Sequence, residues 1–177
     1  ELQNLMHQLI TGGYETTQSA INHGMWALIR FPEIADKIYE DDSLLKPFTE
    51  EVLRWESPVQ FLLRRTQKDV EVSGTMIPKD SMVMMGYGPA NRDESKFSCP
   101  HQFKLDREGV GAHVAFGSGA HHCPGALLGR QEMMRSFKFL IKRLKNIKLD
   151  KPLQEPVHNF SMFFMPMKEF FITFDKR

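Results

Sequence analysis

The chain has 177 residues, of which 41% are hydrophobic and 11% aromatic, so it can bury a sizeable core as one domain. Its 23 Lys and Arg residues nearly balance its 22 Asp and Glu residues, and the net charge of +1 gives no bulk field that would attract nucleic acid or an acidic membrane. The two cysteines form no disulfide framework, and no stretch resembles a leader or a membrane-spanning run. We therefore expect a cytoplasmic protein with neither a nucleic-acid nor a membrane partner.

Residues 1–31 have the pattern of one long amphipathic helix that ends before Pro32. The apolar residues that recur at three- and four-residue spacing are Leu2, Leu5, Met6, Leu9, Ile10, Ala20, Ile21, Met25, Leu28 and Ile29. Glu1 lies inside this pattern without a cap, so we expect that an N-terminal neighbour is missing or made separately.

The middle of this helix, Gly12-Gly13-Tyr14-Glu15-Thr16-Thr17, combines two helix-weakening glycines with an acid and two hydroxyls. One interpretation is a local groove where a ligand lies against the backbone, with a carboxylate and a hydroxyl that order water and pass protons. The alternative is a kinked core helix in which Thr16 bonds back to a carbonyl.

Two shorter helices are predicted next, over residues 32–39 and 44–55. Glu51 and Arg54 stand three residues apart on one face of the second, where they either serve a special role or form a solvated surface pair worth under ~1 kcal/mol. Residues 59–87 carry β-branched and apolar residues broken by turn signals, which predicts two or three short antiparallel strands. Arg64 and Arg65 on the first strand are either a surface basic pair or a clamp for carboxylates.

The second half of the chain begins with an irregular segment over residues 88–115, which has little periodicity. From Cys123 onward apolar residues recur at helical spacing, with Pro124 suited to the first helical position. A Phe- and Met-rich stretch over residues 160–165, which is either core or the wall of an apolar substrate pocket, then leads to a strand over residues 169–174. These elements predict a mainly α fold with small antiparallel β-sheets.

The stretch from Phe116 to Gly125 carries the most specific chemistry, because two glycines precede His121 and Cys123 follows it closely. If a helix begins at Cys123, its first-turn amides and its dipole favour the ionised sulfur. A thiolate on a glycine-built loop, which lets a flat ligand approach the backbone, offers one axial sulfur to haem iron. His121 and Cys123 are too isolated to form a four-ligand zinc site.

Three motifs resemble those of the cytochrome P450 family and occur in that family's order. They are the haem-binding loop Phe116-Gly117-x-Gly119-x-His121-x-Cys123-x-Gly125, the oxygen-activating helix motif Gly12-Gly13-x-Glu15-Thr16-Thr17 and the pair Glu51-x-x-Arg54. The stretches 77–78, 90–93 and 103–107 are similar to the soluble bacterial type. The resemblance runs over residues 1–177 and implies the C-terminal part of the cytochrome P450 fold, with the N-terminal part of the haem domain missing.

This resemblance implies a haem-thiolate monooxygenase that inserts one atom of O₂ into a small apolar organic substrate. The implied cofactor is haem b (iron protoporphyrin IX), whose thiolate ligand pushes electron density toward O–O cleavage. The implied partners are a ferredoxin or flavodoxin-type redox protein and its reductase, which relay electrons from NAD(P)H. The alternative is a truncated or non-catalytic haem-binding or sensing module.

Position by position, the resemblance assigns Cys123 as the axial ligand of the iron. It assigns Glu15 and Thr16 as the catalytic acid and alcohol that deliver protons to iron-bound O₂. Phe116 is expected to pack near the sulfur. The cofactor-binding positions that it assigns besides Cys123 are His121, Arg64, Phe116, Gly117, Gly125, Gly12 and Gly13.

Two further roles follow from the same resemblance. His121 and Arg64 are expected to bond the haem propionates. Glu51 and Arg54, together with Arg107 from the irregular segment, are expected to form a buried ion network that holds the haem loop in place.

Overall fold

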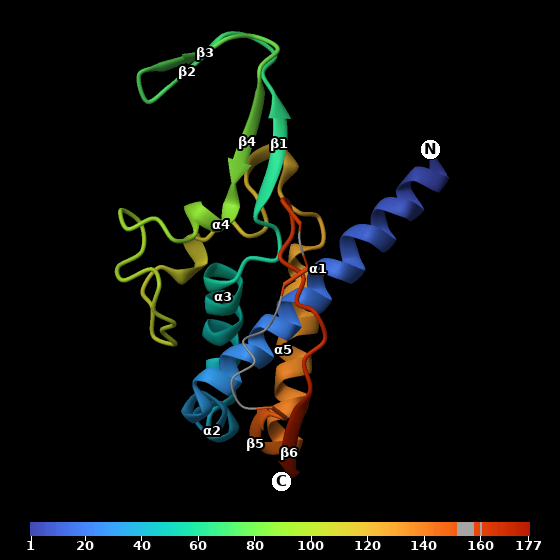
Figure 1. Cartoon of the computed structure of the whole chain (residues 1–177), viewed down its shortest axis with the longest axis vertical. Coiled ribbons are helices and arrows are strands. Elements are labelled where there is room, and N and C mark those ends of the chain that lie inside the picture. The colour runs from blue at the N-terminus through green and yellow to red at the C-terminus, as the bar shows by residue number, and fades with distance from the viewer. Residues whose placement is uncertain (152–157, 160) are drawn as a thin grey trace.

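The computed structural model describes residues 1–151, 158–159 and 161–177 (Figure 1). The helices are α1 (Leu2–Arg30), α2 (Pro32–Glu40), η1 (Asp42–Leu44), α3 (Leu45–Trp55), α4 (Tyr87–Ala90), η2 (Val110–Ala112), η3 (Gly119–His121) and α5 (Ala126–Arg143), where η marks a short 3₁₀ helix. The strands are β1 (Phe61–Arg65), β2 (Val70–Val72), β3 (Thr75–Ile77), β4 (Met82–Gly86), β5 (Leu144–Leu149) and β6 (Ile172–Lys176). The predicted mainly α fold with small antiparallel sheets is confirmed.

Helix α1 is continuous through its glycine-containing middle, so the single long helix is confirmed and the kink is not seen. Its N-terminal half projects away from the rest of the chain (Figure 1). The exposed apolar side chains of that half are Leu2, Leu5, Met6, Leu9, Ile10 and Tyr14. The buried residues of the helix all lie between Ser19 and Leu28, so only its C-terminal half joins the core.

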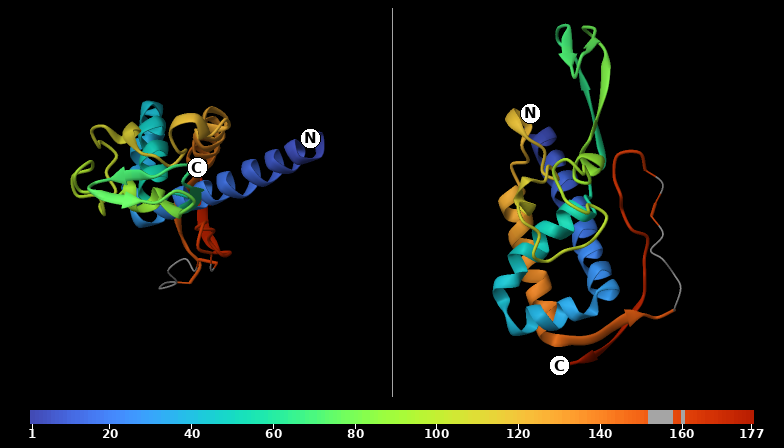
Figure 2. Two further views of the ribbon diagram at one scale, coloured as in Figure 1. Left: turned by 90° about the horizontal axis from the view of Figure 1, so that it is seen from above. Right: turned by 90° about the vertical axis from the view of Figure 1, so that its left-hand side faces the viewer.

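The core lies where α1, α2, α3 and α5 pack on one another, as Figure 2 shows from two sides. The Phe137 ring of α5 meets the Phe48 ring of α3 edge-on, with 5.0 Å between the centroids. A methyl group added at Gly24 of α1 would stand only 2.1 Å from Cζ of Phe137. The close approach of α1 to α5 therefore requires glycine at this position.

The strands form three separate two-stranded antiparallel sheets, in which β1 pairs with β4, β2 with β3, and β5 with β6. Residues 59–87 thus hold four strands rather than two or three. Ser73 and Gly74 both have positive φ, of 48° and 79°, and this turn closes β2 and β3 into a hairpin of their own. The β1–β4 ribbon places Arg64 opposite Val83.

The C-terminal region differs from the sequence-based expectation in two places. Leu144 continues the helical spacing of α5 but begins β5, because it pairs with Lys176. The strand expected over residues 169–174 is displaced to Ile172–Lys176, since pairing with β5 starts where Ile172 meets Leu149. In the Phe- and Met-rich stretch, Phe160 lies outside the described residues, and Phe164 forms a β-bridge with Val59.

Residues 88–115 form the irregular segment that the sequence predicts, interrupted only by the end of α4 and by η2. The segment lies beside α3 in Figure 1, and its backbone carbonyls accept hydrogen bonds from a side chain of that helix. Among the described residues, no helix is both long and apolar enough to cross a membrane.

The glycine at the crossing of α1 and α5 gives a stability prediction. Gly24→Ala should lower the free energy of unfolding by roughly 1–3 kcal/mol, because the added methyl overpacks the Phe137 ring. Gly13→Ala is the matched control on the same helix, where the methyl meets nothing within 4 Å. Higher helix propensity should stabilise that variant by up to about 1 kcal/mol. Urea unfolding followed by circular dichroism measures both, and a Gly24→Ala variant as stable as wild type contradicts the packing account.

Candidate functional site

A cavity of about 460 Å³ lies between α1, β1 and the loop that precedes α5. Eight of the ten residues that the resemblance assigns to catalysis or haem binding line it, and they are Gly12, Glu15, Thr16, Arg64, Phe116, Gly117, His121 and Cys123. Gly13 and Gly125 are not among its lining residues. Apolar side chains of Val59, Leu62 and Phe164 complete part of the wall. Segments more than one hundred residues apart in the sequence therefore meet at one site.

The loop that carries Cys123 is closed by its own backbone. The Cys123 amide donates to the carbonyl of Phe116 at 2.9 Å, and the Gly117 amide donates to the carbonyl of Val114 at 2.8 Å. Gly117 and Gly119 have φ values of 71° and 70°, a region that strains residues with a side chain. These two glycines thus allow the turn that returns the chain to Phe116.

Helix α5 begins at Ala126 with Gly125 as its N-cap, so Cys123 and Pro124 precede the helix rather than start it. The prediction of a helix start at Cys123 is wrong. The Ala126 amide bonds the Cys123 carbonyl at 3.2 Å, which is a three-residue turn. The four-residue hydrogen bonds of an α-helix start only with the bond from the Gly129 amide to the Gly125 carbonyl. A Cβ at Gly125 would lie 3.8 Å from Cys123 Sγ, so this glycine keeps the space beside the sulfur open.

On the α1 side of the cavity, the Thr16 hydroxyl donates to the Gly12 carbonyl at 2.7 Å. This is the back-bonding that the alternative interpretation expected, yet it occurs in a straight helix at the cavity wall. Glu15 is exposed and Thr16 is half-buried. A methyl at Gly13 would meet nothing within 4 Å. Glu15 is thus open to solvent, and the neighbouring Thr16 faces the cavity.

Arg64 and His121 supply positive or hydrogen-bonding groups at the cavity. Arg64 donates to the carbonyl of Leu63 at 2.8 Å and to the Tyr87 hydroxyl at 3.5 Å. Its neighbour Arg65 points to the exposed carboxylate of Asp80, 3.2 Å away. The basic pair is therefore divided, with one arginine at the cavity and the other on the surface.

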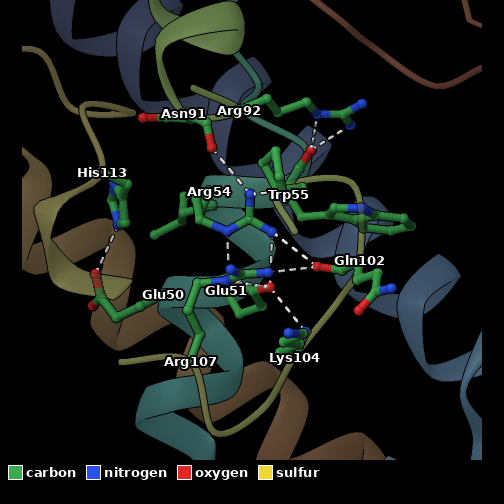
Figure 3. Close-up of polar contacts among 12 residues, drawn as sticks. Glu50, Glu51, Arg54, Trp55, Asn91, Arg92, Gln102, Lys104, Arg107 and His113 are labelled. Atoms are coloured by element: carbon green, nitrogen blue, oxygen red, sulfur yellow. Dashed lines mark hydrogen bonds and ion pairs between the residues drawn. The ribbon is translucent and has the colours of Figure 1, made fainter. Parts of the chain in front are cut away.

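The pair Glu51 and Arg54 is fully buried, so its interpretation as a solvated surface contact is wrong. Arg54 Nε and Nη2 donate to the two carboxylate oxygens of Glu51 at 2.7 and 2.8 Å (Figure 3). Arg107 Nε donates to the same two oxygens at 2.9 and 3.1 Å. One carboxylate is thus shared by two guanidinium groups, which is the buried network that was expected.

The remaining donors of these two arginines hold the irregular segment in place. Arg54 bonds the backbone carbonyls of Asn91, Pro100 and Gln102. Arg107 bonds those of Ser98, Cys99 and Gln102. The segment has little secondary structure of its own, so these bonds satisfy carbonyls that no helix or sheet would satisfy.

A second buried cluster was not foreseen from the sequence. Glu50 accepts from His113 Nε2 at 2.8 Å and from Arg130 Nε at 2.7 Å. Burial alone raises the pKa of the Glu50 carboxyl, but the hydrogen bonds from His113 and Arg130 outweigh it and lower that pKa to about 2. The partners lie 63 and 80 residues away, so no local spacing signals the contacts.

The lowered pKa of Glu50 makes stability depend on pH in a defined window. A carboxyl with a depressed folded-state pKa contributes stability that is present above its usual pKa of 4.5 and lost as the pH falls toward about 2. We expect the difference in unfolding free energy between wild type and Glu50→Gln to shrink over this window by at most about 3 kcal/mol. Denaturant titrations at several pH values test this, with exposed Glu33→Gln as the control. A difference that does not change with pH contradicts it.

A mainly α fold with a cysteine on the wall of a largely apolar cavity has the features expected of a haem-thiolate protein. The chain belongs to the cytochrome P450 family, whose model, described as "Cytochrome P450", matches residues 1–174. Membership of this family implies a haem cofactor.

Comparison with individual proteins agrees with this assignment. The chain is 37% identical over 175 residues to the methyl-branched lipid omega-hydroxylase of Mycobacterium tuberculosis, a match that covers 98% of the chain and 40% of that relative. It superposes on the structure of CYP109Q5 from Chondromyces apiculatus with a TM-score of 0.90 and 36% identity, covering 97% of this chain and 44% of that one. The structure of CYP109E1 from Bacillus megaterium in complex with corticosterone gives a TM-score of 0.87 and 34% identity, and the match covers 93% of this chain and 44% of that one. The chain therefore spans less than half the length of these relatives.

The residues at the cavity fit a haem. A free thiol, which is the donor that this class uses, lies on the wall beside a glycine that leaves the sulfur approachable. Arg64 and His121 carry donors suited to carboxylates. The lining between them is largely apolar, which suits a flat macrocycle.

Proposed function

We propose that the chain forms part of a haem b monooxygenase, and that residues 1–177 correspond to the C-terminal portion of its haem domain. The observation that carries the proposal is the shared cavity, to which the Cys123 loop and the acid–alcohol pair of α1 both contribute walls. A thiolate ligand and a proton-delivering pair in one cavity are what reductive activation of O₂ requires.

In this proposal Cys123 binds the haem iron through its thiolate, while Arg64 and His121 bind the propionates. Phe116 and Gly117 contact the haem from the loop, and Gly125 keeps the sulfur accessible. When bound, the haem supplies the oxygen chemistry. The polypeptide binds and orients the haem and moves protons.

Proton movement is assigned to Glu15 and Thr16. The Thr16 hydroxyl hydrogen is directed at the Gly12 carbonyl, so the lone pairs of Oγ1 remain available to accept a proton donor in the cavity. Glu15 is exposed and exchanges protons with solvent. Gly12 contributes no side chain to this wall of the cavity, whereas Gly13 is not among the lining residues.

The substrate class is proposed to be small and apolar. Val59, Leu62 and Phe164 provide apolar wall. The relatives named above include a lipid omega-hydroxylase and a protein solved with corticosterone, both at more than one-third identity. Electrons are proposed to come from NAD(P)H through a ferredoxin or flavodoxin-type partner and its reductase.

The first test is the ferrous carbon monoxide difference spectrum of the haem-loaded 177-residue chain. The wild type and Cys99→Ser should both give the strongly red-shifted Soret band of a thiolate ligand, because Cys99 lies outside the cavity. Cys123→Ser should lose the shift. A shifted band that survives Cys123→Ser, or no bound haem in any variant, contradicts the proposed site.

The second test separates an oxygenase from a haem-binding or sensing module that does not turn over. With surrogate redox partners and corticosterone or a methyl-branched fatty acid as probes, product formation should depend on O₂. Thr16→Ala should lower it roughly 10²-fold, the scale of a lost acid–base group.

Thr11→Ala is the matched control for that test. The Thr11 hydroxyl also lines the cavity and bonds back to a carbonyl of the preceding turn, at 2.9 Å, but the preceding residue is not an acid. Its loss should therefore reduce product formation far less. Equal losses in the two variants would show that Thr16 has no special role, and a chain that binds haem without any turnover would favour the module.

A further inference from the structure

Glu50 joins three elements that surround the cysteine loop. It lies on α3 and is 7% exposed. Its Oε2 accepts from Nε2 of His113, just before the loop, at 2.8 Å, and its two oxygens accept from Nε and Nη2 of Arg130 on α5 at 2.7 and 3.1 Å. Its carboxylate thus bonds residues on both sides of the Cys123 loop in the sequence.

The tautomer of His113 follows from its second contact. The Ala115 amide donates to His113 Nδ1 at 3.2 Å, so this nitrogen carries a lone pair. Neutral His113 therefore has its proton on Nε2 and donates it to Glu50. The carboxylate fixes both the orientation and the tautomer of the ring.

Both partners of Glu50 pack against Phe116. The Arg130 guanidinium carbon lies 4.4 Å from the centroid of the Phe116 ring, and the His113 ring centroid lies 6.3 Å from it. Gly129 of α5 lies next to the same ring, since a Cβ added there would stand 3.8 Å from it. The Phe116 ring therefore packs against the two side chains that Glu50 bonds, and its remaining surface lines the cavity.

Phe116 is in turn bound to Cys123. The Phe116 carbonyl accepts from the Cys123 amide at 2.9 Å, and both residues line the cavity. A continuous series of contacts therefore runs from Glu50, through His113 and Arg130, to Phe116 and the cysteine. Glu51, the next residue of α3, faces the separate arginine network of the irregular segment (Figure 3).

We propose that Glu50 is a positioning residue for Cys123, which acts by holding His113 and Arg130 against Phe116. The consequence for chemistry rests on the proposed function, in which Cys123 Sγ is the haem ligand. Glu50→Gln keeps the size of the side chain but loses its charge, and it presents an NH₂ group to two donors. Arg130, whose side chain is 27% exposed, is then free to turn toward solvent and leave the Phe116 ring.

The first measurement follows the thiol itself. In a Cys99→Ser background Cys123 is the sole cysteine, and its alkylation by iodoacetamide in the full chain without added haem is quantified by mass spectrometry. Glu50→Gln should change the alkylation rate roughly three- to tenfold, and Glu50→Asp should restore part of the difference. Glu132→Gln, at an exposed acid of α5, should leave the rate unchanged.

A double-mutant cycle separates positioning through Phe116 from general loosening of the fold. In a Phe116→Ala background, Glu50→Gln should change the alkylation rate by less than about twofold, because the contact through which it acts is gone. The same change in both backgrounds overturns the proposal. The proposal is also overturned if Glu50→Gln leaves the alkylation rate unchanged in the chain that retains Phe116.

The second measurement uses the haem-loaded chain. Glu50→Gln should move a fraction of the ferrous carbon monoxide complex from the red-shifted band to an unshifted band, and Glu50→Asp should reduce that fraction. A Glu50→Gln spectrum identical to wild type overturns the effect on the ligand. If no variant binds haem, the proposed function fails, whereas the alkylation cycle still decides the role of Glu50.

Discussion

Two arginines from different parts of the chain share one buried carboxylate, that of Glu51, and much of the structure around the cavity depends on this contact. The Glu51 carboxylate receives Arg54 from its own helix and Arg107 from the irregular segment. Removing one partner of such a network leaves an uncompensated buried charge, at a cost of about 3–5 kcal/mol. The segment also depends on the arginines for its carbonyl bonds. The Asn91 side chain accepts from the Val114 amide at 2.7 Å and so connects the start of the segment to its end, just before the cysteine loop.

The cavity lies between α1, β1 and the loop that carries Cys123, and α5 also contributes lining residues. Gly24 lets α1 and α5 meet over Phe137, because a Cβ at this position would clash with that ring. Two adjacent glutamates of α3 bond different parts of the structure. Glu51 bonds Arg107 of the irregular segment, and Glu50 bonds His113 and Arg130 on either side of the cysteine loop. Residues far from the sulfur thereby determine where Cys123 lies.

Local patterns in the sequence predict the helices well, because helical periodicity is a short-range property. They do not predict that α5 ends at Arg143, since Leu144 fits the helical spacing and becomes a strand only through its pairing with Lys176. The burial of Glu51 and Arg54 also depends on distant parts of the chain, because their three-residue spacing is the same as that of an exposed surface pair. The family resemblance of short motifs points to the residues of the cavity that carry its chemistry but not to apolar lining residues such as Leu53 and Met133. The Glu50 cluster joins single residues of three distant segments and has no motif.

In the proposed site, Cys123 would bind the iron of a haem through its thiolate. Resonance Raman spectra of the ferric, haem-loaded chain, prepared with natural and with ³⁴S-labelled cysteine, test that bond directly. We predict a band that shifts with the isotope, that persists in Cys99→Ser and that disappears in Cys123→Ser. A spectrum without an isotope-sensitive band, or a band that persists in Cys123→Ser and is lost in Cys99→Ser, would contradict the account.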